Sequence, residues 1–229
     1  MDKGSVLPWV EPLEFAANYA ATPTMVFYYS GLIDAEEEAR SFIALNPTRE
    51  IEGDWKALEK ALSMPKNSTW QKAWFGFLGY ELKNQWHEFP TLPSSPVTFP
   101  ELWMAQFSTV FVFHHASKTL ERFGEEVPLA PVNSEEEVAE VVALESNYDK
   151  ARYLEIIDDT LEQIKAGEFY QANITRKFFG QLRKRPEPFS LFRRLCRQSP
   201  ALYSAFISHH GKAILTSSPE CFLTMDAQG

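Results

Sequence analysis

The stretch from Asp149 to Thr175 constrains the fold more than any other part of this sequence. An amphipathic run stops there at Gly167, and alternating polar and apolar residues follow. Asp149 can accept hydrogen bonds from the amides of a first helical turn, and Gly167 suits the left-handed position just past a helix end. We therefore predict a helix that ends near Gly167 and a half-buried strand that starts near Tyr170. The predicted buried helix face has the three- and four-residue spacing of Tyr153, Ile156, Ile157, Thr160, Leu161 and Ile164.

The composition indicates a folded protein with a substantial core. The 229 residues are enough for one large or two small domains, since a domain usually has about 100–200 residues. A hydrophobic content of 45% and an aromatic content of 14% argue against a disordered chain. The net charge of −9 argues against a nucleic-acid-binding protein, although a local arginine cluster or a bound cation can still prepare one cleft for an anionic substrate.

No targeting segment, membrane span or metal motif is evident in the sequence. A basic flank followed by about 7–15 apolar residues is missing, and no window reaches about 18 apolar residues. We therefore expect a cytoplasmic protein without a membrane partner. Cys196 and Cys221 lie far apart, so neither a disulfide framework nor a zinc site is indicated. The pairs His114–His115 and His209–His210 point to opposite strand faces, which is a poor arrangement for one metal ion.

The first 130 residues are predicted to be rich in strands. Aromatic and β-branched runs at 24–29 and 106–113 have the composition of half-buried strands, and 55–62 has helical spacing. Gly76 and Gly79 interrupt an aromatic run and predict a bulge or a turn.

The later segments are predicted from turn residues and from hydrophobic runs. The proline-rich stretch 90–100 predicts a surface crossing, and the acidic stretch 128–147 predicts a solvated linker. A helix is expected from Pro188 to Arg197, starting near Ser190. Two antiparallel strands are expected at 201–207 and 213–217, joined at His209, His210 and Gly211.

Two polar groupings are candidates for chemistry. In an extended strand, Gln171, Asn173 and Thr175 share one face and can line a polar cleft; the alternative is an edge strand with an ordinary solvated face. Glu220 follows Ser218 and a proline that ends or kinks a strand. A partly desolvated glutamate there has a raised pKa and can donate a proton near neutral pH; the alternative is a solvated turn residue.

These two motifs together resemble the chorismate-utilising enzymes, a family that includes aminodeoxychorismate synthase, anthranilate synthase, isochorismate synthase and salicylate synthase. The resemblance implies an α+β fold of antiparallel β-sheets packed together with flanking helices. It implies an N-terminal domain at 1–145 and the first part of a chorismate-binding domain at 146–229. It also implies that Glu220 is a general acid and that Gln171, Asn173, Thr175 and Ser218 line the substrate cleft. Cys221 departs from the pattern of the aminodeoxychorismate branch of the family, which usually has arginine there.

The resemblance also implies an inner pocket, which holds tryptophan in some relatives. The segment 199–206 is similar to one wall of that pocket, and 29–31 is similar to the other. The basic residue expected next is poorly matched, because Arg40 is near but Ser41 takes its place. Simple packing between domains is the favoured reading of these residues, and amino-acid binding is the alternative. The candidate pocket residues are Ser30, Tyr203, Ser204 and Phe206.

Three functional hypotheses remain open at this point. The leading one is a portion of aminodeoxychorismate synthase component I, which aminates chorismate with ammonia from a glutamine amidotransferase partner. The second is a portion of anthranilate synthase component I, and the third is a non-catalytic relic or binding module. Family members are about twice as long as this chain, so we expect the Mg²⁺ ligands and the remaining catalytic groups to lie beyond Gly229.

Overall fold

The computed structural model describes residues 4–32, 39–63, 69–89, 97–129, 140–184 and 186–225. The chain divides into two compact units, the first formed by 1–135 together with 188–229 and the second by 136–187. A domain boundary near residue 145, which the family resemblance implies, stays a prediction.

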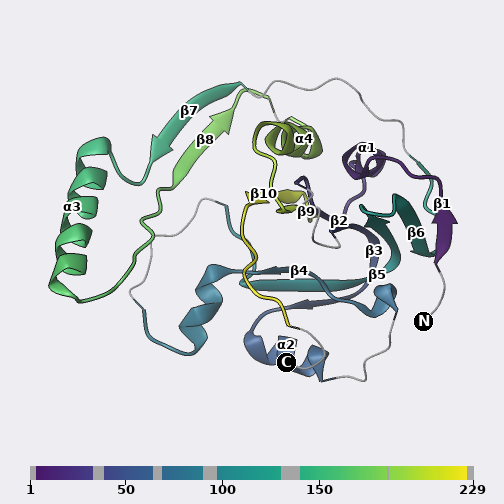
Figure 1. The fold of residues 1–229 in the computed structure, drawn as a ribbon, viewed down its shortest axis with the longest axis horizontal. Coiled ribbons are helices and arrows are strands. Elements are labelled where there is room, and N and C mark those ends of the chain that lie inside the picture. The colour runs from purple at the N-terminus through teal and green to yellow at the C-terminus, as the bar shows by residue number, and fades with distance from the viewer. Residues whose placement is uncertain are drawn as a thin grey trace. The chain divides into compact units, whose positions relative to one another are not determined.

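The first unit is built on one 8-stranded sheet in which every paired strand is antiparallel (Figure 1). The strand order is β1-β6-β5-β3-β2-β9-β10, and β4 pairs with β5. This architecture confirms the predicted α+β class with antiparallel sheets. The strands are β1 (Ser5–Leu7), β2 (Met25–Tyr29), β3 (Arg40–Glu52), β4 (Phe75–Leu78), β5 (Leu102–His114), β6 (Thr119–Gly124), β9 (Tyr203–His209) and β10 (Lys212–Ser218).

Both faces of the central strands are buried, which explains why these strands are almost continuously apolar in sequence. Alternate residues of a strand point to opposite faces, so Phe27 and Ile43 enter one core cluster while Val26 and Ala44 enter another. The helices α1 (Pro12–Ala17) and α4 (Pro188–Gln198) contribute to the first cluster. The strand and helix predictions at 24–29, 106–113 and 188–197 are confirmed.

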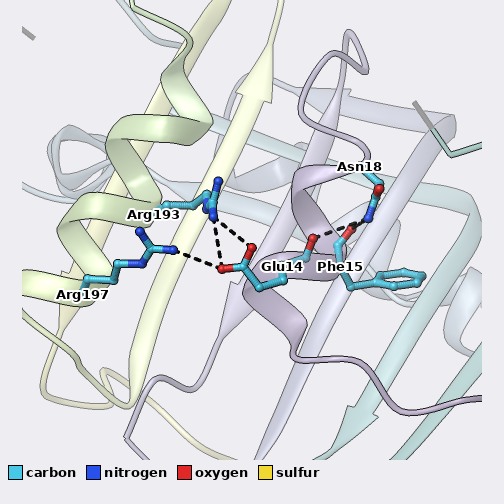
Figure 2. Close-up of polar contacts among 5 residues, drawn as sticks. All are labelled: Glu14, Phe15, Asn18, Arg193 and Arg197. Carbon is cyan, nitrogen blue, oxygen red and sulfur yellow. Dashed lines mark hydrogen bonds and ion pairs between the residues drawn. The ribbon is translucent and has the colours of Figure 1, made fainter. Parts of the chain in front are cut away.

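A charged contact joins these two helices across the first cluster. Arg193 of α4 is only 8% exposed, and its guanidinium donates to the carboxylate of Glu14 on α1 (Figure 2). Arg197, one helical turn later, donates to the same carboxylate. The contact joins residues that are 179 positions apart in sequence, so α4 is fixed against the N-terminal part of the chain.

A third, smaller core cluster of Leu58, Leu82 and Leu102 lies under short helices, and β4 approaches β5 closely beside it. The helix α2 (Trp55–Leu62) is where the sequence predicts it, and the Asp54 carboxylate accepts from the Ala57 amide at 3.0 Å. At Gly76 a Cβ atom would lie 2.1 Å from the carbonyl oxygen of Trp103, so only glycine allows β4 to approach β5 there. The 3₁₀ helices η1 (Trp70–Lys72) and η2 (Tyr80–Gln85) flank β4. Of the predicted bulge or turn at Gly76 and Gly79, the turn is found after Gly79, whereas β4 pairs with β5 in continuous register at Gly76.

The hairpin between β9 and β10 follows the predicted turn. His210 and Gly211 both have positive φ angles, of 47° and 71°, as a two-residue hairpin turn requires. Residue pairs such as Ile207 with Ile214 lie opposite each other across the hairpin. The predicted antiparallel pair is therefore confirmed.

The second unit contains β7 (Val141–Ser146), α3 (Lys150–Ala166) and β8 (Phe178–Leu182), and β7 pairs with β8 in antiparallel fashion. The Asp149 carboxylate accepts from the Arg152 amide at 2.8 Å, and Gly167 has a φ angle of 81°. Both predicted ends of this helix are confirmed. The linker prediction is wrong over β7, because the apolar residues there pair with β8; the acidic run 133–137 lies outside the described residues, as does most of the predicted crossing at 90–100.

Two predictions about this unit are wrong. No strand begins at Tyr170: residues 171–177 form no regular element, and β8 starts at Phe178. An extended segment becomes a strand only when another backbone pairs with it, and here Ile174 O instead accepts from the Tyr153 hydroxyl at 3.3 Å. The predicted buried face of α3 is at most half-buried, because within this unit the described residues form only β7, β8 and α3, and no second layer covers the helix.

No helix among the described residues is both long enough and apolar enough to cross a membrane.

Candidate functional site

A cavity of about 640 Å³ lies where β2 ends, β3 begins and β9 begins. Antiparallel pairing places these three positions together, since Tyr28 lies opposite both Phe42 of β3 and Ala205 of β9. The walls are largely aromatic and aliphatic, with a few polar groups and one arginine among the lining residues described. The lining residues are Tyr28, Tyr29, Ser30, Ala39, Arg40, Phe42, Leu202, Tyr203, Ser204, Ala205 and Thr224.

Three of the four residues predicted for an inner pocket meet at this cavity. Ser30, Tyr203 and Ser204 line it, although Ser30 is far from the other two in sequence. Phe206, the fourth, is not among the residues that line it. It lies two residues further along β9, is 1% exposed and packs edge-on against Phe189 of α4, with ring centroids 5.1 Å apart.

Tyr28 lines the cavity, and its hydroxyl is hydrogen-bonded to the backbone of Gly76. The hydroxyl donates to the carbonyl oxygen of Gly76 at 2.7 Å and accepts from the Gly76 amide at 2.8 Å. Burial raises the pKa of Tyr28 to about 12, and the bond to the Gly76 backbone opposes that rise only in part. Tyr28 therefore stays neutral at any physiological pH, and its hydrogen bonds link β2 to β4.

The structure places Arg40 at the cavity and Ser41 behind it. Neighbouring strand residues face opposite ways, so Arg40 lines the cavity while Ser41 is fully buried. Ser30 links the two, because its hydroxyl donates to the Arg40 carbonyl oxygen at 3.2 Å and its amide donates to the Ser41 hydroxyl at 3.1 Å. Arg40 is thus the basic residue of this wall, which the sequence alone left undecided.

Tyr28, Phe42 and Thr224 line the cavity but were not among the predicted site residues. The two aromatic side chains have a signal in the sequence: once Ser30 is assigned to the wall, strand alternation and antiparallel pairing put Tyr28 and Phe42 beside it. Thr224 has no such signal, because it follows the last strand and belongs to no regular element.

Burial also determines the chemistry of the thiol near this cavity. Cys196 of α4 is 4% exposed, and burial raises the pKa of its thiol to about 11, against a small opposing effect of the Ser204 hydroxyl. The thiolate form is therefore scarce near neutral pH, and Cys196 serves as a small apolar core residue.

Glu220 follows the end of β10 in an exposed bend. The Ser218 hydroxyl donates to the Glu220 carbonyl oxygen at 3.1 Å, and the Glu220 amide approaches the same hydroxyl oxygen at 3.4 Å. Ser218 therefore holds the backbone of Glu220, and the carboxylate side chain is exposed. The desolvation that a proton donor needs is not supplied by the described residues around Glu220.

Gln171, Asn173 and Thr175 belong to the second compact unit, between α3 and β8. All three side chains are exposed. Because no strand forms there, they do not make the single strand face that alternation predicts. The end of this segment is anchored by Lys177, whose amide donates to the Asn147 side-chain oxygen at 2.8 Å.

The described residues do not form a metal centre by themselves. Among them, no group of three or more His, Cys, Asp or Glu side chains is close enough to hold an ion. Mg²⁺ prefers an octahedral shell of oxygen ligands, so the residues that the structure describes do not fit such an ion.

Comparisons with known proteins identify relatives named aminodeoxychorismate synthase and anthranilate synthase. The chain is 36% identical over 86 residues to aminodeoxychorismate synthase of Streptomyces griseus, an alignment that covers 38% of this chain and 12% of that protein. It is 20% identical over 246 residues to aminodeoxychorismate synthase component 1 of Escherichia coli, covering 97% of this chain and 53% of that protein. It is 23% identical over 171 residues to anthranilate synthase component 1 of Thermus thermophilus, covering 67% of this chain and 36% of that protein.

The fold is also found among solved structures. Anthranilate synthase component I of Streptococcus pneumoniae superposes with a TM-score of 0.64 at 16% identity, over 82% of this chain and 52% of that one. The chain thus spans about half the length of the Escherichia coli relative and of the Streptococcus pneumoniae structure, and its alignments with the other two relatives cover 12% and 36% of those proteins. The family described as chorismate binding enzyme matches residues 16–229, and the chain belongs to that family.

Proposed function

We propose that this chain is the N-terminal portion of an aminodeoxychorismate synthase component I. The complete protein would convert chorismate to 4-amino-4-deoxychorismate in the cytoplasm, with ammonia from a glutamine amidotransferase partner. The observation that carries the proposal is the family match over residues 16–229. The choice of reaction is supported by relatives named aminodeoxychorismate synthase, including one that aligns with 97% of the chain.

The proposed role of Glu220 is to protonate the hydroxyl group that leaves the chorismate ring. Ser218 fixes its backbone and leaves the carboxylate exposed, so bound substrate and the rest of the protein must provide the desolvation that favours the protonated acid. Gln171, Asn173 and Thr175 are proposed to donate and accept hydrogen bonds at the substrate, since amides and hydroxyls do both. In the complete protein a Mg²⁺ ion would neutralise charge on the substrate carboxylate.

The cavity in the first unit is proposed as the inner pocket, with an aromatic amino acid such as tryptophan as its ligand. Aromatic side chains at Tyr28, Phe42 and Tyr203 suit a planar ring, and Arg40 suits a carboxylate. A volume of about 640 Å³ leaves ample room for a ligand of that size. The alternative is a packing void with no ligand.

Anthranilate synthase component I is the second candidate, supported by the relative in Thermus thermophilus and by the TM-score of 0.64. One assay separates it from the first: the complete reading frame that contains residues 1–229 is expressed and incubated with chorismate, ammonium and Mg²⁺. Under the first proposal, p-aminobenzoate forms once aminodeoxychorismate lyase is added. Direct release of fluorescent anthranilate would establish the second candidate. No consumption of chorismate, in a protein that folds, would reject both and leave a non-catalytic module.

A further inference from the structure

A buried histidine lies behind the cavity wall and is hydrogen-bonded to it. His115 is 4% exposed, and its Nε2 atom lies 2.8 Å from the hydroxyl of the fully buried Ser41. The Ser41 hydroxyl oxygen also accepts the amide of Ser30, and Ser30 in turn donates to the carbonyl oxygen of Arg40. Two polar residues of the cavity wall, Ser30 and Arg40, are thus connected to His115 through one hydroxyl group.

The protonation state of His115 determines which atoms donate and which accept in these hydrogen bonds. When the ring is neutral and Nε2 carries no proton, Ser41 donates its hydrogen to Nε2 and accepts from Ser30, so both of its roles are filled. When the ring is protonated, Nε2 must donate to Ser41, whose oxygen then serves two donors while its own hydrogen needs a new acceptor. In that neutral ring the single proton is on Nδ1, which is buried without a hydrogen-bond partner among the described residues, so the proton that charges the ring is added at Nε2, the atom that faces Ser41.

The surroundings of the ring disfavour its charged form. Burial is the largest effect that lowers the pKa of His115, Lys118 adds to it, and Glu11 opposes it. Lys118 and Glu11 lie 3.6 Å apart and partly offset each other. The ring also packs edge-on against Trp9. The titratable and charged groups around the ring are Glu11 before α1, Lys118 in the turn after β5, and Arg40 and His114, which share a small cavity with His115.

We propose that His115 is a positioning residue for the cavity wall, and that its protonation loosens the bond between Ser41 and Ser30. In the neutral state, Ser41 holds the end of β2 against the start of β3, which gives the cavity its shape. In the protonated state, the Ser41 hydroxyl turns and its bond to the Ser30 amide weakens. The cavity therefore binds its ligand best when His115 is neutral, and binding weakens as the pH falls. This consequence for binding rests on the proposed ligand, whereas the change in the wall does not.

The wall is tested without any ligand. In the full chain, NMR follows the His115 ring and the Ser30 amide from about pH 8 to pH 5, the range in which histidine titrates. We expect the Ser30 amide shift to move with the same midpoint as the ring, below 6.5, the ordinary value for the side chain. His115→Gln keeps a polar partner for Ser41 but cannot titrate, and should make the Ser30 shift independent of pH. The matched control is His114→Gln: because His114 is bound to Glu121 at 3.0 Å and not to Ser41, the Ser30 amide should still follow the His115 midpoint in that variant.

A second variant guards against a failure of His115→Gln to fold. Ser41→Ala removes the connecting hydroxyl, so the ring should still titrate while the Ser30 amide no longer follows it. A Ser30 amide that ignores the His115 midpoint in the unaltered protein, or that still follows pH in His115→Gln, would overturn the proposal.

Binding is measured with L-tryptophan as the probe, by calorimetry above and below the ring midpoint. Loss of one hydrogen bond in the wall should weaken binding by roughly two- to tenfold, and His115→Gln should abolish this pH dependence. If tryptophan does not bind at either pH, the proposed ligand is wrong, and the NMR titration alone decides the role of His115. Binding that is equally tight at both pH values would contradict the coupling between His115 and the ligand.

Discussion

Glu14 of α1 accepts two hydrogen bonds from the same guanidinium nitrogen of Arg193 on α4, at 2.9 and 3.1 Å. The arginine is 8% exposed, whereas about half of the Glu14 side chain is exposed. The pair therefore neutralises a buried cation with a half-exposed carboxylate, a geometry in which removing the acid costs more than removing an exposed partner.

The first prediction concerns this pair. Glu14→Gln should lower the free energy of unfolding by about 1–2 kcal/mol, because Arg193 stays buried without a counter-charge, and exposure of the carboxylate reduces the loss. Arg197→Gln is the matched control, since Arg197 is half-exposed, and should change stability by less than about 0.5 kcal/mol. Urea denaturation measures both. Equal effects of the two variants would show that burial of Arg193 does not matter.

The second prediction concerns the hydroxyl of Tyr28. Tyr28→Phe leaves both the amide and the carbonyl oxygen of Gly76 without their partner, so we expect a loss of about 1–3 kcal/mol in stability. Tyr80→Phe is the control, because that side chain is 79% exposed and its hydroxyl can bond to water. Thermal unfolding of the two variants makes the comparison. A Tyr28→Phe protein as stable as the parent would mean that water replaces the hydroxyl.

The third prediction separates two kinds of glycine. Gly76→Ala should destabilise the protein by at least about 3 kcal/mol or prevent folding, because its Cβ would overlap the Trp103 carbonyl oxygen. Gly53 has a φ angle of 131°, but no atom lies within 4 Å of the position that a Cβ would take, so Gly53→Ala should cost only about 1–2 kcal/mol from backbone strain. Denaturation midpoints of the purified variants test the difference. Similar losses would show that β4 can move away from β5.

Some features of the fold can be predicted from the sequence, and others cannot. Local patterns predicted the Asp149 and Gly167 helix ends correctly, because capping depends on neighbouring residues alone. They did not predict that β2 pairs with β9, which lies far away in sequence. The cavity depends on that pairing, and so does the placement of Phe206 in the core instead of the cavity wall.

Each of the errors has an identifiable origin. The segment 171–177 alternates like a strand, but alternation predicts only which side chains would share a face, and a strand also needs a backbone partner. The acidic run before β7 dominates the local composition and indicates a linker, although Val141, Val142 and Leu144 have strand propensity. The basic residue of the cavity wall could be identified as Arg40 only once the structure showed which strand face lines the cavity.

The fourth prediction is a pH dependence of stability. The folded-state pKa of His115 and that of His209 both lie below the ordinary value of 6.5, in each case chiefly because of burial. The unfolded chain therefore binds more protons than the folded one between those values and 6.5. Stability should be fully present above pH 6.5 and should fall as the pH drops through 6.5 toward the folded-state values.

Denaturation curves at a series of pH values measure this slope. His115→Gln and His209→Gln should each flatten part of it, and His87→Gln is the control, since no buried environment surrounds that side chain. A slope of the opposite sign between pH 5 and 6.5, about the range in which histidine titrates, would mean that carboxylates outweigh both histidines.

The fifth prediction concerns Glu220 in the complete protein. If Glu220 protonates the departing hydroxyl, Glu220→Gln keeps its shape but removes the transferable proton. General acid catalysis contributes about 10²–10⁴-fold, so kcat should fall by that factor while KM changes little. Gln171→Ala is the comparison, because loss of one hydrogen bond should cost about 1 kcal/mol, or nearly tenfold. Steady-state kinetics with chorismate and ammonium distinguish the two effects, and full turnover by a folded Glu220→Gln protein would reduce Glu220 to a solvated residue of the bend after β10.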